Sequence, residues 1–182
     1  MEILLKDVRL AFPQLFEAKT VNGEGKPAFS ASFLMDADHP AIAAINDAVE
    51  AIGKEKWAAK WPAIKKELAA KDKLPLHDGD LKSRYSGFEG MMYVSARSQT
   101  RQPVIDRDKT PLSASDGKPY AGCYVNAKIT LWAQDNNYGK RINASLGAVQ
   151  FLKNGEAFAG GGVSSTDDFD DLGVDDEEEA LV

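Results

Sequence analysis

A mainly β fold with one helical insertion (α+β) is predicted for this chain. Apolar residues alternate with polar ones in several short stretches, and a single stretch between them has helical spacing. Hydrophobic residues make up 43% of the 182 residues, which is enough for a domain that buries its own core. About five strands interrupted by one helix match an OB-fold-like five-stranded barrel. Other small barrels and α+β sheets produce the same pattern.

The N-terminal segment predicts two strands joined by a turn. The alternation near the start places Val8, Leu10 and Phe12 on one face of a strand that ends at Pro13. A cluster rich in Gly and Asn follows and favours a turn. Aromatic and small residues then alternate over 29–35, which predicts a second strand with one buried face.

A helical insertion is expected over about 39–71. Asp38 has the residue type of an N-cap, and Pro40 suits the first helical turn. Isoleucine and valine residues recur every three or four positions after it, which is typical of one buried helix face. Gly53 is expected to loosen this helix, and Pro62 to kink or split its second part.

Three further strands are predicted at about 91–98, 123–132 and 141–148. A polar loop at 77–80 precedes the first of them, and 135–139 form the hairpin loop between the last two. The buried faces are expected to carry Met92, Val94 and Ala96, then Cys123, Val125, Ala127, Ile129 and Leu131, and then Ile142, Ala144, Leu146 and Ala148.

Charge divides the chain into a body and a tail. The net charge is −6, but nine of the 28 acidic residues lie after Ser164, where no Lys or Arg occurs. The body therefore has 19 acidic and 22 basic residues, a net charge of +3. We expect a folded domain over 1–159, and a Gly linker with a disordered acidic C-terminal tail over 160–182.

The predicted outer face of the sheet combines aromatic rings with cations. Unpaired nucleic acid strands need such a face, because bases stack on rings while Lys and Arg neutralise phosphates. The alternative is that these rings are buried under the helical insertion. The candidate DNA-binding residues are Tyr93, Arg97, Tyr124, Asn126, Lys128, Trp132, Arg141 and Asn143, with Arg84, Tyr85, Arg101 and Lys118 in the adjoining loops.

The tail is expected to act as a tethered polyanion. Held close to its own domain, it would occupy the basic surface until a nucleic acid displaces it. Phe169, Leu172 and the terminal Leu181 and Val182 would offer apolar contacts to a partner protein. The alternative is a tail that only increases solubility. The tail residues assigned to this role are Asp167, Asp168, Phe169, Asp170, Asp171, Asp175, Asp176, Glu177, Glu178 and Glu179.

Several segments resemble a tailed-phage family of OB-fold single-stranded DNA-binding proteins with acidic C-termini. They are the segments 122–129 (GCYVNAKI), 138–141 (YGKR), 149–152 (VQFL) and 155–158 (GEAF), together with the Asp78–Asp80 turn. The resemblance implies a protein that binds single-stranded DNA during phage DNA replication and recombination, with tail contacts to replication proteins.

No enzymatic activity, cofactor or metal site is expected. The chain has two His and one Cys, and no phosphate-binding loop motif. The rival interpretations are a metal-dependent nuclease that uses Asp78, Asp80 and Glu89, a strand-annealing recombination accessory, and a purely protein-binding module. We expect a cytoplasmic protein (host cytoplasm if phage-encoded) that does not bind membranes. We expect a monomer or a weak homo-oligomer, and one alternative is that it binds DNA cooperatively.

Overall fold

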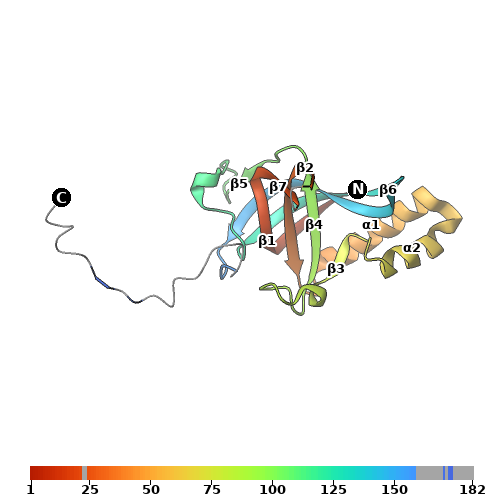
Figure 1. Cartoon of the computed structure of the whole chain (residues 1–182), viewed down its shortest axis with the longest axis horizontal. Helices are drawn as coiled ribbons and strands as arrows, with labels where there is room; N and C mark the ends of the chain where they lie inside the picture. The colour runs from red at the N-terminus through yellow and green to blue at the C-terminus, as the bar shows by residue number, and fades with distance from the viewer. Residues whose placement is uncertain (22–23, 159–169, 171, 174–182) are drawn as a thin grey trace.

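The computed structural model describes residues 1–21, 24–158, 170 and 172–173. Seven strands and two α-helices form in this part of the chain (Figure 1). The strands are β1 (Glu2–Val21), β2 (Glu24–Met35), β3 (Leu76–Asp78), β4 (Met92–Ser98), β5 (Val104–Ile105), β6 (Tyr124–Asn136) and β7 (Gly139–Lys153). The helices are α1 (Pro40–Trp57) and α2 (Trp61–Ala70), and the 3₁₀ turns are η1 (Ala58–Lys60), η2 (Gly79–Lys82) and η3 (Ala114–Asp116).

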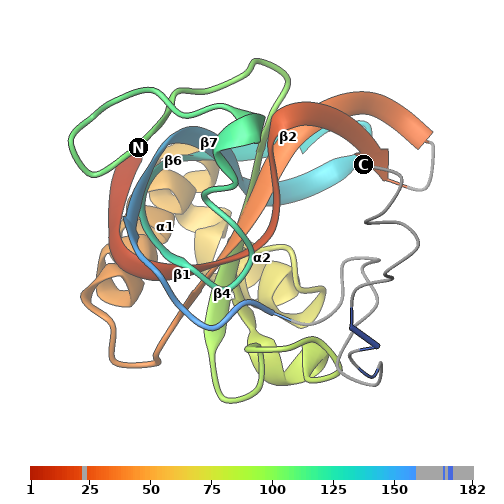
Figure 2. The same cartoon turned by 90° about the vertical axis from the view of Figure 1, so that its left-hand side faces the viewer.

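Five of the strands close into a barrel. The sheet order is β3-β4-β2-β1-β6-β7-β5, and an additional parallel pairing joins β4 to β7 at Arg97 and Ser145. Strands β1, β2, β4, β6 and β7 therefore surround one core, as the end-on view shows with α1 behind them (Figure 2). The short strands β3 and β5 extend the sheet at its two ends. The predicted barrel with a helical insertion is confirmed.

Strand β1 is longer than predicted because a β-bulge carries it past Pro13. The register shifts between Ala11 and Gln14, and Phe12 adopts a φ of 48°. A bulge tolerates a proline and reverses the alternation of faces. Ala11 is consequently buried, whereas Phe12 is 42% exposed. The predictions that this strand ends at Pro13 and that Phe12 faces the core are wrong.

The helical insertion lies where it was predicted, with a different cap. His39, not Asp38, is the N-cap, since its Nδ1 accepts a hydrogen bond from the Ala41 backbone N–H at 3.0 Å. The helix break falls at η1, where Ala58 has a φ of 49°. Pro62 then occupies the first turn of α2, a position that needs no backbone N–H.

Gly53 serves close packing inside α1 and does not interrupt the helix. A Cβ at this position would lie 2.2 Å from the nearest ring carbon of Trp61. The Trp61 ring also stacks on Trp57 at a centroid distance of 5.7 Å. The Trp57 indole Nε1 in turn donates to Asp135 on β6 at 3.0 Å, which attaches the insertion to the barrel.

The strands after the insertion bury the predicted faces, except that Met92 is only partly buried and that Ala148 does not lie on the core side. The inward positions of β6 and the first half of β7 are buried, as expected. Ile129 pairs with Leu146, but Ala127 pairs with Val149, so β7 contains one extra residue between them. This bulge replaces Ala148 with Val149 on the core side, where Val149 is 1% exposed. The prediction for Ala148 is therefore wrong.

A second, smaller apolar cluster forms outside the barrel. The predicted polar loop at 77–80 contains β3 and η2, and the chain from 79 to 91 then covers the outer side of β1, β2 and β4. The buried members, which we call the outer cluster, are Ala11, Leu34, Phe88 and Tyr93, and Tyr85, Met91 and Phe158 pack against them. Phe158 brings the segment that follows β7 to this cluster.

Most of the predicted tail lies outside the described residues, as do the predicted Gly linker and the turn residues 22 and 23. Asp170, Leu172 and Gly173 belong to no helix or strand, and Leu172 is exposed. The division into 1–159 and 160–182 thus stays a prediction. No helix in the described part of the chain is long and apolar enough to cross a membrane.

Candidate nucleic-acid interface

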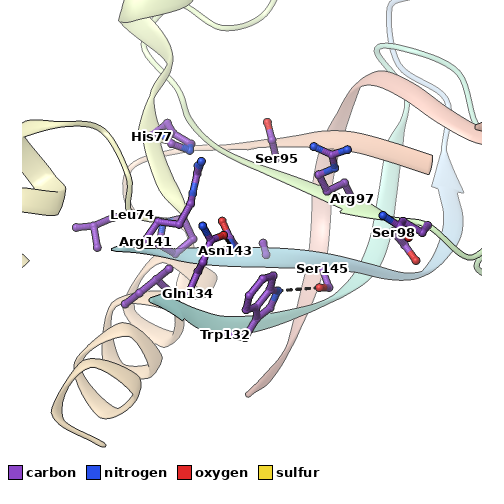
Figure 3. A pocket seen from close by; sticks show the side chains of 14 residues that line it. Leu74, His77, Ser95, Arg97, Ser98, Trp132, Gln134, Arg141, Asn143 and Ser145 are labelled. Atoms are coloured by element: carbon purple, nitrogen blue, oxygen red, sulfur yellow. Dashed lines mark hydrogen bonds between the residues drawn. The ribbon is translucent and has the colours of Figure 1, made fainter. Parts of the chain in front are cut away.

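A groove of about 580 Å³ lies where β4, β6 and β7 meet the segment before β3 (Figure 3). The parallel pairing of β4 with β7 brings its two walls together. The groove is lined by Leu74, Pro75, His77, Ser95, Arg97, Ser98, Gln99, Trp132, Gln134, Arg141, Ile142, Asn143, Ala144 and Ser145. Four of the predicted DNA-binding residues are among them: Arg97, Trp132, Arg141 and Asn143.

The indole ring of Trp132 is fixed in this groove by a hydrogen bond and is accessible to solvent. Its indole Nε1 donates to the Ser145 hydroxyl at 2.9 Å, and the side chain remains 43% exposed (Figure 3). On the same wall, the Asn143 amide donates to Gln134 Oε1 at 2.9 Å. A fixed ring with an exposed face can accept a base without a large loss of side-chain entropy.

The two arginines of the groove are exposed cations. Among the described residues, neither Arg97 nor Arg141 takes part in an ion pair. In Figure 3, Arg97 lies toward one end of the groove beside Ser98, and Arg141 lies toward the other end beside His77. Cations on both sides of an exposed ring can contact the phosphates of a strand whose base stacks on that ring.

Tyr93 is not available for stacking. It was expected to face solvent from β4, but it is 4% exposed and belongs to the outer cluster. His77 stacks on one side of it at 5.1 Å, and the Lys82 ammonium lies 5.1 Å from its ring centroid. The prediction of an outward, exposed Tyr93 is wrong because the chain over 79–91 covers that face of β4.

The remaining candidates on β6 lie outside the groove. Tyr124 is partly buried, and its ring faces the Arg9 guanidinium at 5.6 Å and the Lys153 ammonium at 4.9 Å. Asn126 accepts a hydrogen bond from the Asp7 backbone and donates to Gln150, so its amide is engaged within the fold. Lys128 is exposed.

The candidates in loops fall into three separate places. Arg84 stacks on Tyr85 at 4.8 Å from the ring centroid, beside the outer cluster. Arg101 lies 5.5 Å from the centroid of Phe16 on β1.

Lys118 forms an ion pair with Asp106 at 2.8 Å, and its hydrogen bond lowers the pKa of that carboxyl group. None of the predicted loop residues lines the groove.

Two of the three carboxylates of the nuclease hypothesis, Asp78 and Asp80, have structural roles. Asp78 Oδ1 accepts from the Asp80 backbone N–H, and Asp80 Oδ1 accepts from Gly90. In the described segments, no three acidic, His or Cys side chains come together as a metal site would require. Burial raises the pKa of the Cys123 thiol, which keeps it in the unreactive protonated form.

Several groove residues carried no distinguishing signal in the sequence. Alternation places Ser95 and Ser145 on the outward face of their strands, but a serine there does not differ from any solvated strand residue. Leu74 and Pro75 enter the groove because the segment before β3 bonds to β7, where the Ile142 backbone N–H donates to the Lys73 carbonyl. Gln134 enters it from β6, where it pairs with Arg141 of β7. Only the tertiary pairing could reveal them.

Comparison with known proteins identifies a family for this chain. The family model of the single-stranded DNA-binding protein of Enterobacter phage Enc34 matches residues 1–181. A protein named p50 of Acyrthosiphon pisum secondary endosymbiont phage 1 is 44% identical, over 100% of this chain and 99% of that protein.

Solved structures are also similar to this chain, and two of them are described here. The Enc34 protein in complex with single-stranded DNA has a TM-score of 0.74 at 31% identity, covering 86% of this chain and 88% of that one. The single-stranded DNA-binding protein encoded by bacteriophage T7 has a TM-score of 0.58 at 13% identity, covering 93% of this chain and 97% of that one, which supports the fold alone. Because the family model matches residues 1–181, this chain belongs to the Enc34 family of phage single-stranded DNA-binding proteins.

Proposed function

We propose that this protein coats single-stranded DNA in the host cytoplasm during phage DNA replication and recombination, without catalysing a reaction. DNA would lie in the groove, with a base stacked on Trp132 and phosphates at Arg97 and Arg141. The observation that carries this proposal is the exposed indole between two cations that have no acidic partner in the described structure. Because every base has a π-face, such a site discriminates little between sequences.

The acidic tail adds a second part to the proposal. Residues 167–179 would compete with DNA for the basic groove and also contact replication proteins. The support is the charge difference, since nine acids follow a body with a net charge of +3. A polyanion attached to the same domain has a high effective concentration at that surface.

Trp132→Ala tests the stacking contact. We expect a loss of about 1–3 kcal/mol in binding to a labelled oligonucleotide, because one base loses its aromatic partner. Leu4→Ala is the matched control, since Leu4 is 49% exposed but lies outside the groove. If the folded Trp132 variant binds as tightly as the Leu4 variant, DNA does not use the groove in this way.

Removal of the chain after Val163 tests the competition. DNA binding should tighten, and the gain should be larger at low salt, where charge interactions are screened least. Equal affinities of the full-length and shortened proteins at every salt concentration would exclude competition by the tail.

A further inference from the structure

We propose that the lysine-rich turn between α1 and α2 is a docking site for the acidic tail of a second copy of this chain. The site consists of residues 54–65, which we call the lysine turn, at the end of the helical insertion. None of these residues lines the groove. The inference goes beyond the function proposed above, because it assigns the tail a binding site outside the groove and a contact between copies.

The lysine turn accounts for the whole net positive charge of the body. Residues 54–65 contain four Lys, one Glu and no Arg. Subtracting them from the 22 basic and 19 acidic residues of the body leaves 18 of each, so the rest of the body has a net charge of zero. The attraction of the body for a polyanion at long range is therefore concentrated at this turn.

Most of the lysine charge in the turn is free to meet a ligand. Only Lys65 is paired among the described residues, with Glu50 of α1. The other three lysines are exposed and form no ion pair within residues 1–21 and 24–158; they are Lys54, Lys56 and Lys60. Three unpaired cations within seven residues form a compact positive surface.

The backbone that carries these lysines is fixed on the barrel. Trp57 and Trp61 stack on each other, and their indole N–H groups donate to Asp135 and Glu50. Because Asp135 belongs to β6, these contacts hold the lysine turn in one position relative to the strands. A docking surface that is already ordered loses little conformational entropy when a ligand binds.

Helix stability explains only part of this charge. Lys54 and Lys56 lie in the last turn of α1, where cations interact favourably with the helix dipole. Lys60 is instead the N-cap residue of α2, whose first turn contains no acidic side chain. A cation at a helix N-terminus is unfavourable, so Lys60 increases the charge of the turn without stabilising α2.

The lysine turn suits a carboxylate-rich peptide better than a single DNA strand. Its two aromatic side chains, Trp57 and Trp61, are 7% and 2% exposed, so no base can stack on them. Small apolar residues are exposed between the lysines instead: Ala58, Ala59 and Pro62. The surface therefore offers positive charges around a shallow apolar area.

The tail has the complementary composition. Its nine acidic residues include the run Asp175–Glu179, and Phe169 and Leu172 lie among the others. Leu172 is 91% exposed, so its side chain is not buried against its own domain. On the lysine turn, the carboxylates of the tail pair with the lysines while its apolar side chains cover the exposed alanines.

The place where the tail leaves the body favours a second copy over the same chain. Phe158 packs against the outer cluster, beside the barrel. Figure 1 shows the segment after β7, in blue, toward one end of the molecule and the turn between α1 and α2 at the other. Copies that follow one another in the same orientation bring the tail of one chain next to the lysine turn of the next. Contacts of this head-to-tail kind build an open array.

Two full-length charge variants test this contact without DNA. The first, Lys54→Glu/Lys56→Glu/Lys60→Glu, removes the docking site and keeps the tail. The second replaces the five acids of 175–179 by their amides and keeps the lysine turn. In sedimentation velocity at about 10 mM salt, the wild type should associate, and each variant alone should associate at least about tenfold more weakly. About 1 M salt should dissociate the wild type.

An equimolar mixture of the two variants gives the decisive readout. One variant supplies a tail and the other a lysine turn, so the mixture should form one-to-one pairs and no larger array. Lys6→Glu/Lys26→Glu/Lys109→Glu is the matched control, because it makes the same charge change at three exposed lysines outside the turn. This control should associate like the wild type.

Two further measurements keep the test independent of folding and of DNA binding. If the Glu variant of the lysine turn is unfolded, Lys54→Gln/Lys56→Gln/Lys60→Gln removes the charge without placing acids at the end of α1, and it should show the same loss. On an oligonucleotide that holds one copy, the variants of the turn should bind like the wild type. On one that holds several copies, they should lose the extra affinity that contacts between neighbours supply.

The outcomes separate this inference from its alternatives. A wild type that stays monomeric at low salt, a mixture that does not pair, or an equal loss in the control variant would refute docking of the tail on the lysine turn. Loss of binding to labelled duplex DNA, with self-association unchanged, would assign the turn to duplex DNA instead. A wild type that associates but binds no oligonucleotide would refute the proposed function and leave this inference standing.

Discussion

Replacement of Arg97 and Arg141 by alanine should make DNA binding less sensitive to salt. Both side chains line the groove, and neither has an acidic partner among the described residues. Each is therefore expected to neutralise one phosphate and to release the counterions that phosphate had condensed. The signature of such a contact is the slope of log K against log salt concentration.

The size of the effect follows from the number of contacts. For single strands each phosphate contact contributes about −0.7 to the slope, so the double variant should have a slope shallower by about 1.4. Between about 50 and 200 mM salt, the wild type would then lose about sevenfold more affinity than the double variant. Each single variant should show about half of the change in slope.

Fluorescence anisotropy of a labelled oligonucleotide at four or more salt concentrations measures this slope. Lys66→Ala is the control, because it removes an exposed positive charge on α2, outside the groove. An equal slope for the wild type, the double arginine variant and the Lys66 variant would refute the placement of phosphates at Arg97 and Arg141.

Three further predictions concern the fold. Gly53→Ala should lower the free energy of unfolding in denaturant by about 1–3 kcal/mol, because the new methyl group would collide with Trp61. Alanine favours helices more than glycine does, so an increase in stability would contradict this packing. Cys123 should resist thiol reagents in the folded protein and react after unfolding, since burial raises the pKa of its thiol. Rapid labelling of the folded protein would contradict this prediction.

The third concerns pH. Hydrogen bonds from Lys65 and Trp61 lower the pKa of Glu50 below 4.5. Its contribution to stability is thus present above that pH and lost as the pH falls through the lowered value. Unfolding measured between about pH 6 and pH 3 should show a smaller loss of stability for Glu50→Gln than for the wild type. Parallel curves for both proteins would disprove a stabilising role of this carboxylate.

Local patterns in the sequence were enough to predict much of the fold. Alternation in β6 identified both of its faces, because a strand repeats every two residues and its inner side chains must be apolar. The same reasoning placed Trp132, Arg141 and Asn143 on the outward side of the last hairpin. It failed where an extra residue enters a strand, as at Phe12 and Ala148, because a bulge reverses the alternation and has no reliable sequence mark.

The candidate site needed information that no local pattern holds. Composition alone divided the chain into a mildly basic body and an acidic tail, and alternation alone predicted a barrel with an aromatic and basic outer face. The pairing of β4 with β7 determines which of those outward residues meet in the groove. The chain over 79–91 buries Tyr93 and so removes it from that surface. The physical reason is the sequence separation of the contacts. The alternation of strand faces depends on residues that are neighbours in the sequence, whereas a groove depends on pairings between strands that are far apart in the sequence.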